Sequence, residues 1–240
     1  MMLNTEEEFL RQIGAAITLG PSERLGIGSL RPVDACLRRQ DNSCFALSFP
    51  RRRESMDSDC PFWPGNKVGD THLLVLIPEQ VSDKPLTLDY LGELIKSTQG
   101  DGHKTQYRGD GYAKYVRPAI GNQVSGSSYW VLMTRDVLPG SRWKSYADQC
   151  VLVSDHANRM GLPYEVPGAL EAAVVMLLHH VRSGERLYSD NPFTYTRCRE
   201  SVVVDDNDYA VVVGGLSSGG LSVFDGNYDY NDGVAGLRKF

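Results

Sequence analysis

The chain has 240 residues, of which 41% are hydrophobic and 23% are charged, and its formal net charge is −5. This balance is typical of a globular protein with one larger domain, or one domain plus an appendage. The acidic charge gives no general footprint for nucleic acid, and no apolar run approaches the ~18 residues of a membrane span. We therefore expect neither a nucleic-acid partner nor a transmembrane segment.

The cysteines and the N-terminus bear on cellular location. The first residues are acidic before they become apolar, which is unlike a secretory signal peptide. The cysteines are odd in number and form no CxxC pair, so they predict neither a disulfide framework nor a zinc site. Free thiols favour a cytoplasmic protein or one that is exported by a non-classical route. The five cysteines are Cys36, Cys44, Cys60, Cys150 and Cys198.

Residues 1–69 are expected to form an irregular N-terminal segment. Within it, residues 5–17 have a helical rhythm of apolar side chains, and the first and fourth of them have the spacing of a capping box. The stretch that follows, residues 19–67, contains five prolines and no sustained period. This contrast with the later chain predicts that residues 1 to about 67 are dispensable for folding of the rest.

One part of this segment has a distinctive composition. Residues 45–55 (FALSFPRRRES) resemble a translated bacterial genomic repeat element, which would make much of residues 1–69 an insertion. The three arginines at 51–53 have an alternative interpretation as an anion or nucleic-acid contact. Because the whole chain is acidic, we favour the interpretation that these arginines are simply solvated.

The pattern becomes regular in residues 70–240, which are expected to form a folded domain. Residues 71–81 are a compact apolar run that predicts a buried strand, and residues 87–97 carry the apolar face of a helix. Residues 98–128 are rich in glycine and polar side chains, so they predict a long loop or loops. Residues 128–134 are a second β-rich run.

Two more helices follow in the second half of the chain. Residues 145–160 predict a helix that is closed by Gly161 as its C-cap. Residues 170–181 predict a second, strongly apolar helix that ends at Ser183 and Gly184. Strands, helices and then further strands in this order predict an α+β fold.

The last thirty residues have the composition of a recognition surface. Residues 210–213 and 234–240 predict two strands, and the Gly214-Gly215 pair predicts a break with a backbone reversal. Between the strands, almost every residue of 217–232 is Ser, Gly, Asp, Asn, Tyr or Phe. Tyrosine gives a large contact at low entropic cost, and the small polar residues give adaptable hydrogen bonds. The alternative is a polar loop near the terminus, since turns use the same small residues.

Two groups of residues in the second half of the chain fall at a familiar spacing. They are Gly161, Leu162, Pro163, Tyr164, Pro167, Glu171 and Ala172 in the first group, and Gly214, Gly215, Gly236, Leu237 and Arg238 in the second. With them, roughly residues 128–240 resemble the formylglycine-generating-enzyme branch of the C-type lectin-like fold. The resemblance implies a C-type lectin-like fold with two helices and short antiparallel strands. We interpret the matched residues as structural, with Glu171 placed in the first turn of its helix, where the macrodipole favours an acid.

The resemblance also raises an enzymatic alternative, an oxidase of the formylglycine-generating or sulfatase-modifying-factor type. Such enzymes use a cysteine pair shortly after the double glycine, and no cysteine follows Gly215 here. Cys198 lies between Arg197 and Arg199, and nearby cations lower a thiol pKa, but we favour a small structural cysteine. The five histidines show no metal-ligand spacing. We therefore predict that the protein is not an enzyme, holds no metal and needs no cofactor.

The same fold has a second use in the variable proteins of diversity-generating retroelements. Their C-terminal segment is rewritten at adenine positions, which yields Asn, Tyr, Asp, Ser, Gly and Phe. Residues 217–232 are similar in alphabet and in position. The chain departs from that family at Leu216, where a tryptophan is expected. The resemblance implies a non-enzymatic ligand-binding protein that displays a variable surface near its C-terminus.

We expect this surface to bind a protein, because an exposed loop suits protein recognition better than a deep pocket does. Phe224, Tyr228 and Tyr230 would anchor the partner, and the carboxylates would tune which partner is accepted. Calcium bound by the alternating Asp and Asn residues is an alternative, although the glycine and glutamate of an EF-hand are missing. The oligomeric state is left open. The candidate ligand-binding residues are Ser217, Ser218, Ser222, Phe224, Asp225, Asn227, Tyr228, Asp229, Tyr230, Asn231 and Asp232.

Overall fold

The computed structural model describes most of the chain after residue 55. The described residues are 56–81, 83–98, 111–189, 191–217, 220–226 and 232–240, together with the backbone of Cys36–Arg38 and Cys44–Ala46. These last two segments are β1 and β2, which pair antiparallel. The helix predicted for residues 5–17 and the three arginines at 51–53 lie outside the described residues, as does most of the repeat-like segment 45–55.

The described chain is α+β, as predicted, and its first sheet has four antiparallel strands in the order β3-β6-β11-β7. β3 and β6 confirm the two predicted apolar strands. β11 lies between β6 and β7, and it is shorter than the strand predicted for residues 234–240. The bounds are His72–Ile77 for β3, Tyr129–Thr134 for β6, Tyr164–Glu165 for β7 and Leu237–Lys239 for β11.

The second sheet has three antiparallel strands in the order β10-β9-β8. β9 contains the strand predicted for residues 210–213, and it continues through Gly214 and Gly215, so the predicted break there is wrong. Gly214 instead allows a close approach, because a Cβ at this position would lie 2.5 Å from the backbone oxygen of Thr194. The bounds are Tyr195–Val204 for β8, Asn207–Ser217 for β9 and Gly220–Asp225 for β10.

The three predicted helices in residues 70–240 are confirmed. α5 begins and ends as its sequence indicates: Ser145 Oγ accepts a hydrogen bond from the backbone N–H of Asp148, and Gly161 ends the helix with a φ of 62°. α6 ends in the same way at Gly184, whose φ is 72°. The bounds are Leu88–Thr98 for α3, Tyr146–Met160 for α5 and Ala169–Ser183 for α6.

Part of the region predicted as loops, residues 98–128, is helical. A π-helical stretch, η3 (Tyr112–Val116), runs directly into α4 (Arg117–Ile120). The Tyr112 hydroxyl donates to Asp89 Oδ1 at 2.7 Å, so a residue of α3 holds this stretch in place. So short a stretch shows no clear period, and its stabilising contact is remote in sequence. The remaining short elements are α2 (Val68–Thr71), β4 (Gln80–Val81) and β5 (Lys84–Pro85).

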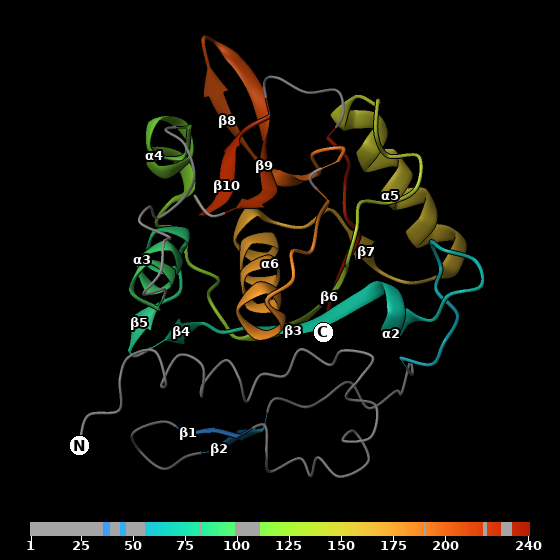
Figure 1. Cartoon of the computed structure of the whole chain (residues 1–240), viewed down its shortest axis with the longest axis horizontal. Helices are drawn as coiled ribbons and strands as arrows, with labels where there is room; N and C mark the ends of the chain where they lie inside the picture. The colour runs from blue at the N-terminus through green and yellow to red at the C-terminus, as the bar shows by residue number, and fades with distance from the viewer. Residues whose placement is uncertain are drawn as a thin grey trace.

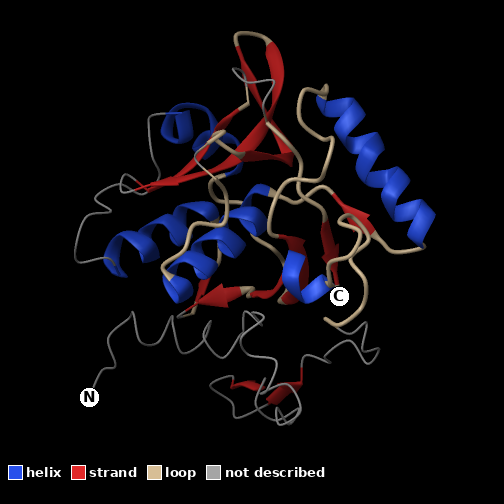
Figure 2. Ribbon diagram, turned by 45° about the vertical axis from the view of Figure 1, so that its right-hand side comes forward, coloured by secondary structure: helices blue, strands red, loops and turns tan. Residues whose placement is uncertain are grey.

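α6 lies in the centre of the described chain, between the two sheets (Figure 1, Figure 2). Residues 172–176 of this helix are at most 2% exposed, so it is buried on all sides rather than along one stripe. Leu73 and Val75 of β3 pack on one side of it, and Val211 and Val213 of β9 belong to the same core. The near-continuous apolar sequence of α6 therefore reflects its position between two layers.

Residues 56–69 belong to the folded part of the chain, which corrects the domain boundary predicted between residues 69 and 70. Phe62 is buried, and its ring centroid lies 4.8 Å from that of Tyr164 and 5.9 Å from that of His72. The sequence pattern conceals these contacts because prolines separate the apolar residues and no period develops. No helix among the described residues has the length and apolar character that crossing a membrane requires.

Candidate functional site

The recognition segment predicted from the sequence, residues 217–232, begins in the turn between β9 and β10. Ser217 pairs with Gly220 across this turn, and four further residue pairs hold β10 against β9. Gly226 then donates its backbone N–H to the carbonyl oxygen of Ala210 at 2.9 Å. The described first part of the segment is therefore a strand of the sheet and not a free loop.

Three of the predicted ligand-binding residues are buried, so the prediction that they form a displayed surface is wrong. Ser222 and Asp225 of β10 are each 5% exposed, and Asp232 is 2% exposed. The two β10 residues are covered because η3 and α6 both pack against this strand. Burial raises the pKa of Asp225 above its ordinary value.

Phe224 is half-buried, and it has a packing role. Its ring meets that of Tyr195 edge-on at a centroid distance of 5.4 Å. Its Cβ also lies so close to Gly111 that a Cβ added to the glycine would come within 2.9 Å. Ser217 is described and is intermediate in exposure. The other predicted ligand-binding residues lie outside the described residues, and they are Ser218, Asn227, Tyr228, Asp229, Tyr230 and Asn231.

A buried glutamine anchors the far end of the segment. Gln149 of α5 is fully buried, and its Nε2 donates to the backbone carbonyl oxygens of Ser141 and Asp232, both at 2.8 Å. Its Oε1 accepts a hydrogen bond from Arg197 Nη1 at 3.2 Å. The Nε of the same arginine lies 3.9 Å from Asp232 Oδ2. The end of the segment is thus tied to α5, to the loop before α5 and to β8.

The residues that follow the segment are held to β8 by hydrogen bonds of their backbone groups. Gly233 donates its N–H to the carbonyl oxygen of Tyr195 at 3.1 Å and accepts the N–H of Arg197 at 2.9 Å. Ala235 is fully buried and donates its N–H to Thr196 Oγ1 at 2.8 Å. The chain is therefore fixed on this side of the segment as it is on the other.

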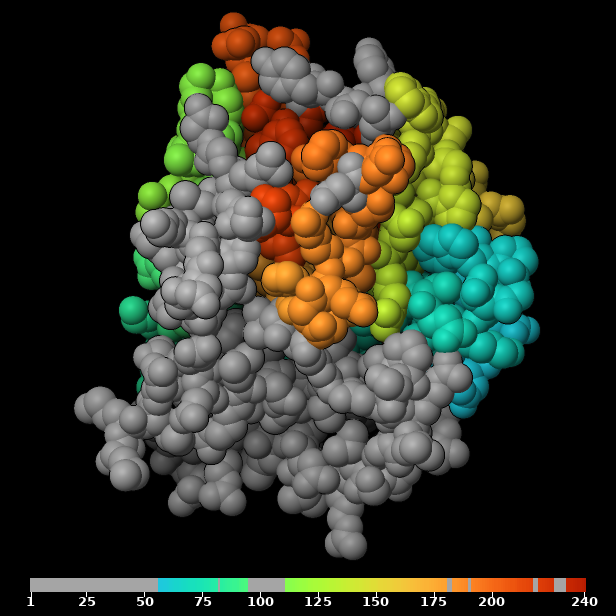
Figure 3. Space-filling view, in the orientation of Figure 1, coloured from blue at the N-terminus to red at the C-terminus, as the bar shows by residue number. Residues whose placement is uncertain are grey.

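Two exposed aromatic side chains lie on loops beside this anchor. Trp143 is 69% exposed and Phe193 is 52% exposed. Arg142 Nη2 donates to Thr194 Oγ1 at 2.6 Å, which joins the two loops, and the loops adjoin in the space-filling view (Figure 3). Trp143 also has a φ of 62°, a conformation that is unfavourable for a bulky residue.

Neither Trp143 nor Phe193 belongs to the set predicted from the sequence. An isolated aromatic residue in a polar loop belongs to neither a helical nor a strand-like apolar pattern, so no periodicity marks it. The one available signal is composition: Trp143 stands between an arginine and a lysine, without an apolar neighbour that would indicate a core position.

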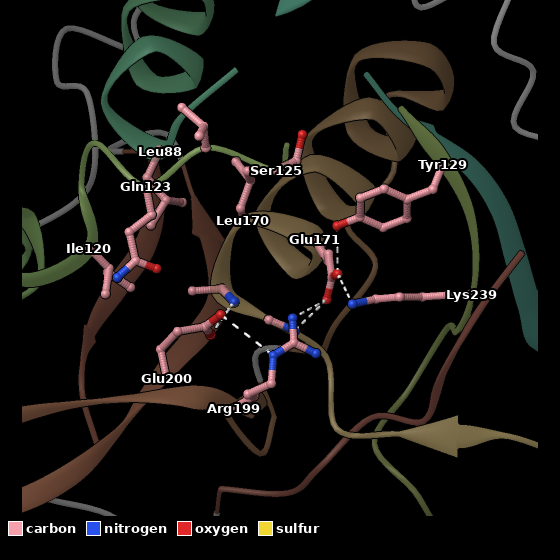
Figure 4. Close-up of a pocket in the computed structure, with 13 residues that line it drawn as sticks. Leu88, Ile120, Gln123, Ser125, Tyr129, Leu170, Glu171, Arg199, Glu200 and Lys239 are labelled. Carbon is pink, nitrogen blue, oxygen red and sulfur yellow. Dashed lines mark hydrogen bonds and ion pairs between the residues drawn. The ribbon is translucent and has the colours of Figure 1, made fainter. Parts of the chain in front are cut away.

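A separate cleft of about 270 Å³ lies at the N-terminus of α6 (Figure 4). Glu171 is buried at its base, and Arg199 and Lys239 point toward this carboxylate from two sides. Glu171 Oε1 accepts hydrogen bonds from Tyr129 Oη at 2.7 Å and Lys239 Nζ at 2.8 Å. Glu171 Oε2 accepts the backbone N–H of Gly168 at 2.6 Å and lies 3.2 Å from Arg199 Nη2.

The protonation of this cluster follows from its contacts. Burial opposes ionisation of Glu171, but the hydrogen bonds from Lys239, Tyr129 and the Gly168 N–H outweigh it, so the pKa of the carboxyl lies below its ordinary value. Burial and the adjacent carboxylate raise the pKa of Tyr129. The ionised Glu171 carboxylate therefore pairs with both Arg199 and Lys239, which joins α6 to β8 and β11. Glu165 also pairs with both cations. Glu171 lies in the first turn of α6, as predicted.

Cys198 is fully buried in β8, and its interpretation as a reactive thiolate is wrong. Burial raises the pKa of its thiol well above the ordinary value. The arginines on either side of it in sequence bond to other groups, Arg197 to Gln149 and Arg199 to Glu171. Among the described residues, no group of three or more His, Cys, Asp or Glu side chains has a geometry that would hold a metal ion.

No protein-family model, curated protein or solved structure matches this chain. The resemblance to the C-type lectin-like fold therefore stays a prediction from the sequence.

Proposed function

We propose that this chain is a non-enzymatic ligand-binding protein with a C-type lectin-like fold. In this proposal, the recognition segment binds a protein partner while the rest of the domain holds the segment in place. The two fifteen-residue helices and the two antiparallel sheets support the fold, because they are the kinds of element that the family resemblance implies.

The observation that carries the proposal is the anchoring of the segment at both ends. On one side Gly226 is bonded to Ala210 of β9, and on the other Gln149 holds the carbonyl oxygen of Asp232. Rigid scaffolds commonly present their binding residues on such bounded segments. Between the two anchors lie five residues, each of which is Asn, Asp or Tyr: Asn227, Tyr228, Asp229, Tyr230 and Asn231.

The described contacts change which aromatic side chains we expect to bind the partner. Phe224 is excluded from this role because its ring packs against Tyr195. Tyr228 and Tyr230 keep it, and Trp143 joins them because it is exposed beside the loop that Gln149 ties to Asp232. A few aromatic side chains near the centre of an interface usually dominate its binding energy.

Diversification by a retroelement is part of the same proposal. Changes at adenine in codons of the AAC type yield the residues that occupy positions 227–231. The proposal predicts a near-copy of the codons for this segment close to a reverse-transcriptase gene. It also predicts that related chains differ mainly at these five positions.

The proposal is tested by capture of partners from an extract of the source cells on three immobilised full-length proteins. They are the wild type, the double variant Tyr228→Ser/Tyr230→Ser and the control Val151→Ser, which removes another exposed apolar side chain from α5. We expect a protein that binds the wild type and the control but binds the double variant at least about tenfold more weakly. Capture that survives the loss of both tyrosines, with unchanged melting temperatures, would contradict the proposal.

A further inference from the structure

The cleft at the N-terminus of α6 has an apolar side and a charged side (Figure 4). The larger apolar side chains of its lining are Leu88, Ile120, Val124 and Leu170. The charged side holds the ion pairs of Glu171 with its two cations. A volume of about 270 Å³ is slightly below that of pockets that hold drug-sized ligands. The cleft therefore has the size and the lining for a small molecule that is apolar at one end and charged at the other.

Both cations of the cleft are occupied by carboxylates of the chain itself. Arg199 Nη1 lies 3.2 Å from Glu165 Oε1, and its Nη2 lies 3.2 Å from Glu171 Oε2. Lys239 Nζ lies 3.0 Å from Glu165 Oε1 and 2.8 Å from Glu171 Oε1. An anionic ligand would have to displace one of these carboxylates, and Glu171 is buried, so it cannot turn to water instead. The cations therefore do not favour an anionic ligand.

The N-terminus of α6 is occupied in the same way. The backbone N–H of Gly168 donates to Glu171 Oε2 at 2.6 Å, and the backbone N–H of Ala169 donates to Glu200 Oε2 at 2.8 Å. Free N–H groups at the start of a helix attract anions, but these two already bind carboxylates of the chain. The helix end therefore draws glutamate side chains into the cleft and does not select an anionic ligand.

One carboxylate oxygen of Glu200 accepts no hydrogen bond from the described residues. Oε2 accepts the N–H of Ala169, whereas Oε1 lies 3.8 Å from Arg199 Nε, which is longer than a hydrogen bond. The Glu200 side chain lines the cleft and is 22% exposed, so a ligand can reach it. The three glutamates of the group also outnumber its two cations, which leaves one surplus negative charge. Both features favour a positively charged ligand.

We propose that this cleft binds a small organic cation, a primary amine in its ammonium form with a hydrocarbon body. The ammonium group donates to Glu200 Oε1, and the hydrocarbon body lies against Leu88, Ile120 and Val124. In Figure 4, Glu200 lies between Ile120 and Arg199, so the charged and apolar contacts are adjacent. This site is separate from the recognition segment, and it does not depend on the function proposed for that segment.

Binding of n-pentylammonium to the full-length protein tests the proposal. A titration at about pH 7, where an alkylamine is protonated, is followed by saturation-transfer NMR. The comparison ligands are n-pentanol and pentanoate, which carry the same hydrocarbon chain without a positive charge. We expect n-pentylammonium to bind at least about fivefold more tightly than either of them, because a hydrogen bond to a charged group is the stronger one. Absence of n-pentylammonium binding, or equal binding of pentanoate, would overturn the proposal.

Three single variants locate the site. Glu200→Gln should weaken n-pentylammonium binding at least about tenfold, since it removes the charge but keeps an oxygen for the N–H of Ala169. Glu93→Gln, at an exposed site on α3, is the control and should bind as the wild type does. Val124→Ser should weaken binding about twofold to threefold by loss of apolar contact, and it leaves the core intact because Val124 is exposed.

Wild-type affinity in a folded Glu200→Gln protein would contradict the proposal. Circular-dichroism melts establish whether this variant is folded. If it is not, the Val124→Ser protein decides the question, and wild-type affinity for n-pentylammonium in that protein would place the amine elsewhere and overturn the proposal.

Discussion

Gln149 and Asp232 are joined by a hydrogen bond of 2.8 Å between the side-chain Nε2 of the glutamine and the backbone carbonyl oxygen of the aspartate. The two residues are 83 positions apart in the sequence. Because the acceptor is a backbone atom, the bond fixes where the recognition segment ends without depending on which side chains precede it. If the segment varies between related chains, as proposed, this bond keeps its end in place.

Loss of this anchor is expected to destabilise the domain. Gln149→Ala should lower the free energy of unfolding by about 3 kcal/mol, because it leaves two buried carbonyl oxygens and a buried guanidinium with fewer partners. Asn158→Ala is the control, since Asn158 is exposed on the same helix, and it should change stability by less than about 0.5 kcal/mol. Urea unfolding followed by circular dichroism measures both. Equal losses in the two variants would mean that the glutamine anchors nothing.

The close approach of the chain at Gly214 yields a second prediction. Gly214→Ala should cost about 3 kcal/mol or more, because its Cβ would lie 2.5 Å from the backbone oxygen of Thr194 and backbone cannot move aside cheaply. Gly161→Ala is the comparison: a φ of 62° at Gly161 is unfavourable for a residue with a Cβ, but nothing lies within 4 Å of the added Cβ, so about 1 kcal/mol is expected. Thermal melts of the two variants should therefore differ clearly. A milder effect at Gly214 than at Gly161 would be inconsistent with the packing of β9 on β8.

His72 makes stability depend on pH. Burial lowers its pKa to about 4 in the folded protein, whereas an unfolded histidine has a pKa of about 6.5. Below about pH 6.5 the unfolded chain takes up a proton that the folded chain does not, so stability is full above this pH and is lost progressively down to about pH 4. At about pH 5 the loss from this residue should be about 2 kcal/mol.

The contribution of His72 is isolated by comparison with His72→Gln. Urea unfolding at about pH 7.5 and about pH 5 is measured for both proteins. We expect the variant to be less stable than the wild type at the higher pH, because the contact of the ring with the Tyr164 hydroxyl is lost. On going from the higher to the lower pH, however, the variant should lose less free energy of unfolding than the wild type does. If the free energy of unfolding changes equally with pH in the two proteins, His72 does not titrate as a buried ring should.

Glu171→Gln tests the carboxylate beneath the cleft. The expected loss is about 1–2 kcal/mol near pH 7, less than for a fully buried ion pair, because the Arg199 and Lys239 side chains are 43% and 38% exposed and can turn to water. The folded pKa of Glu171 lies below its ordinary value, so the wild-type advantage holds above about pH 4.3 and falls as pH drops through the folded pKa. Glu93→Gln, at an exposed site on α3, is the control in the same unfolding series.

The elements that the sequence predicted are those with local causes. β3 and β6 are uninterrupted apolar runs, and α5 carries its own signals at Ser145 and Gly161. The helical stretch from Tyr112 and the packing of Phe62 were not predictable in this way, because both depend on partners far away in the sequence. No periodicity in a single segment reveals such a partner.

The candidate site was predictable in outline but not in its contacts. The aromatic and polar composition of residues 217–232 located the segment. It did not show that Asp232 is buried, because the burial is made possible by Gln149 and Arg197 on other elements. It also did not show that Phe224 packs on Tyr195. The composition of a glycine-rich stretch is the same whether its acidic and aromatic side chains face solvent or pack against a neighbouring strand.

The central claim, that a variable segment is held by a fixed frame, is tested most directly by a saturation library of residues 222–233 in the full-length chain. Each variant is displayed on cells and scored for resistance to protease, so no ligand is needed. We predict that positions 227–231 accept nearly every substitution, whereas Asp225, Asp232 and Gly233 accept few. If positions 227–231 are as intolerant as these three, the segment is part of the core and the account is wrong.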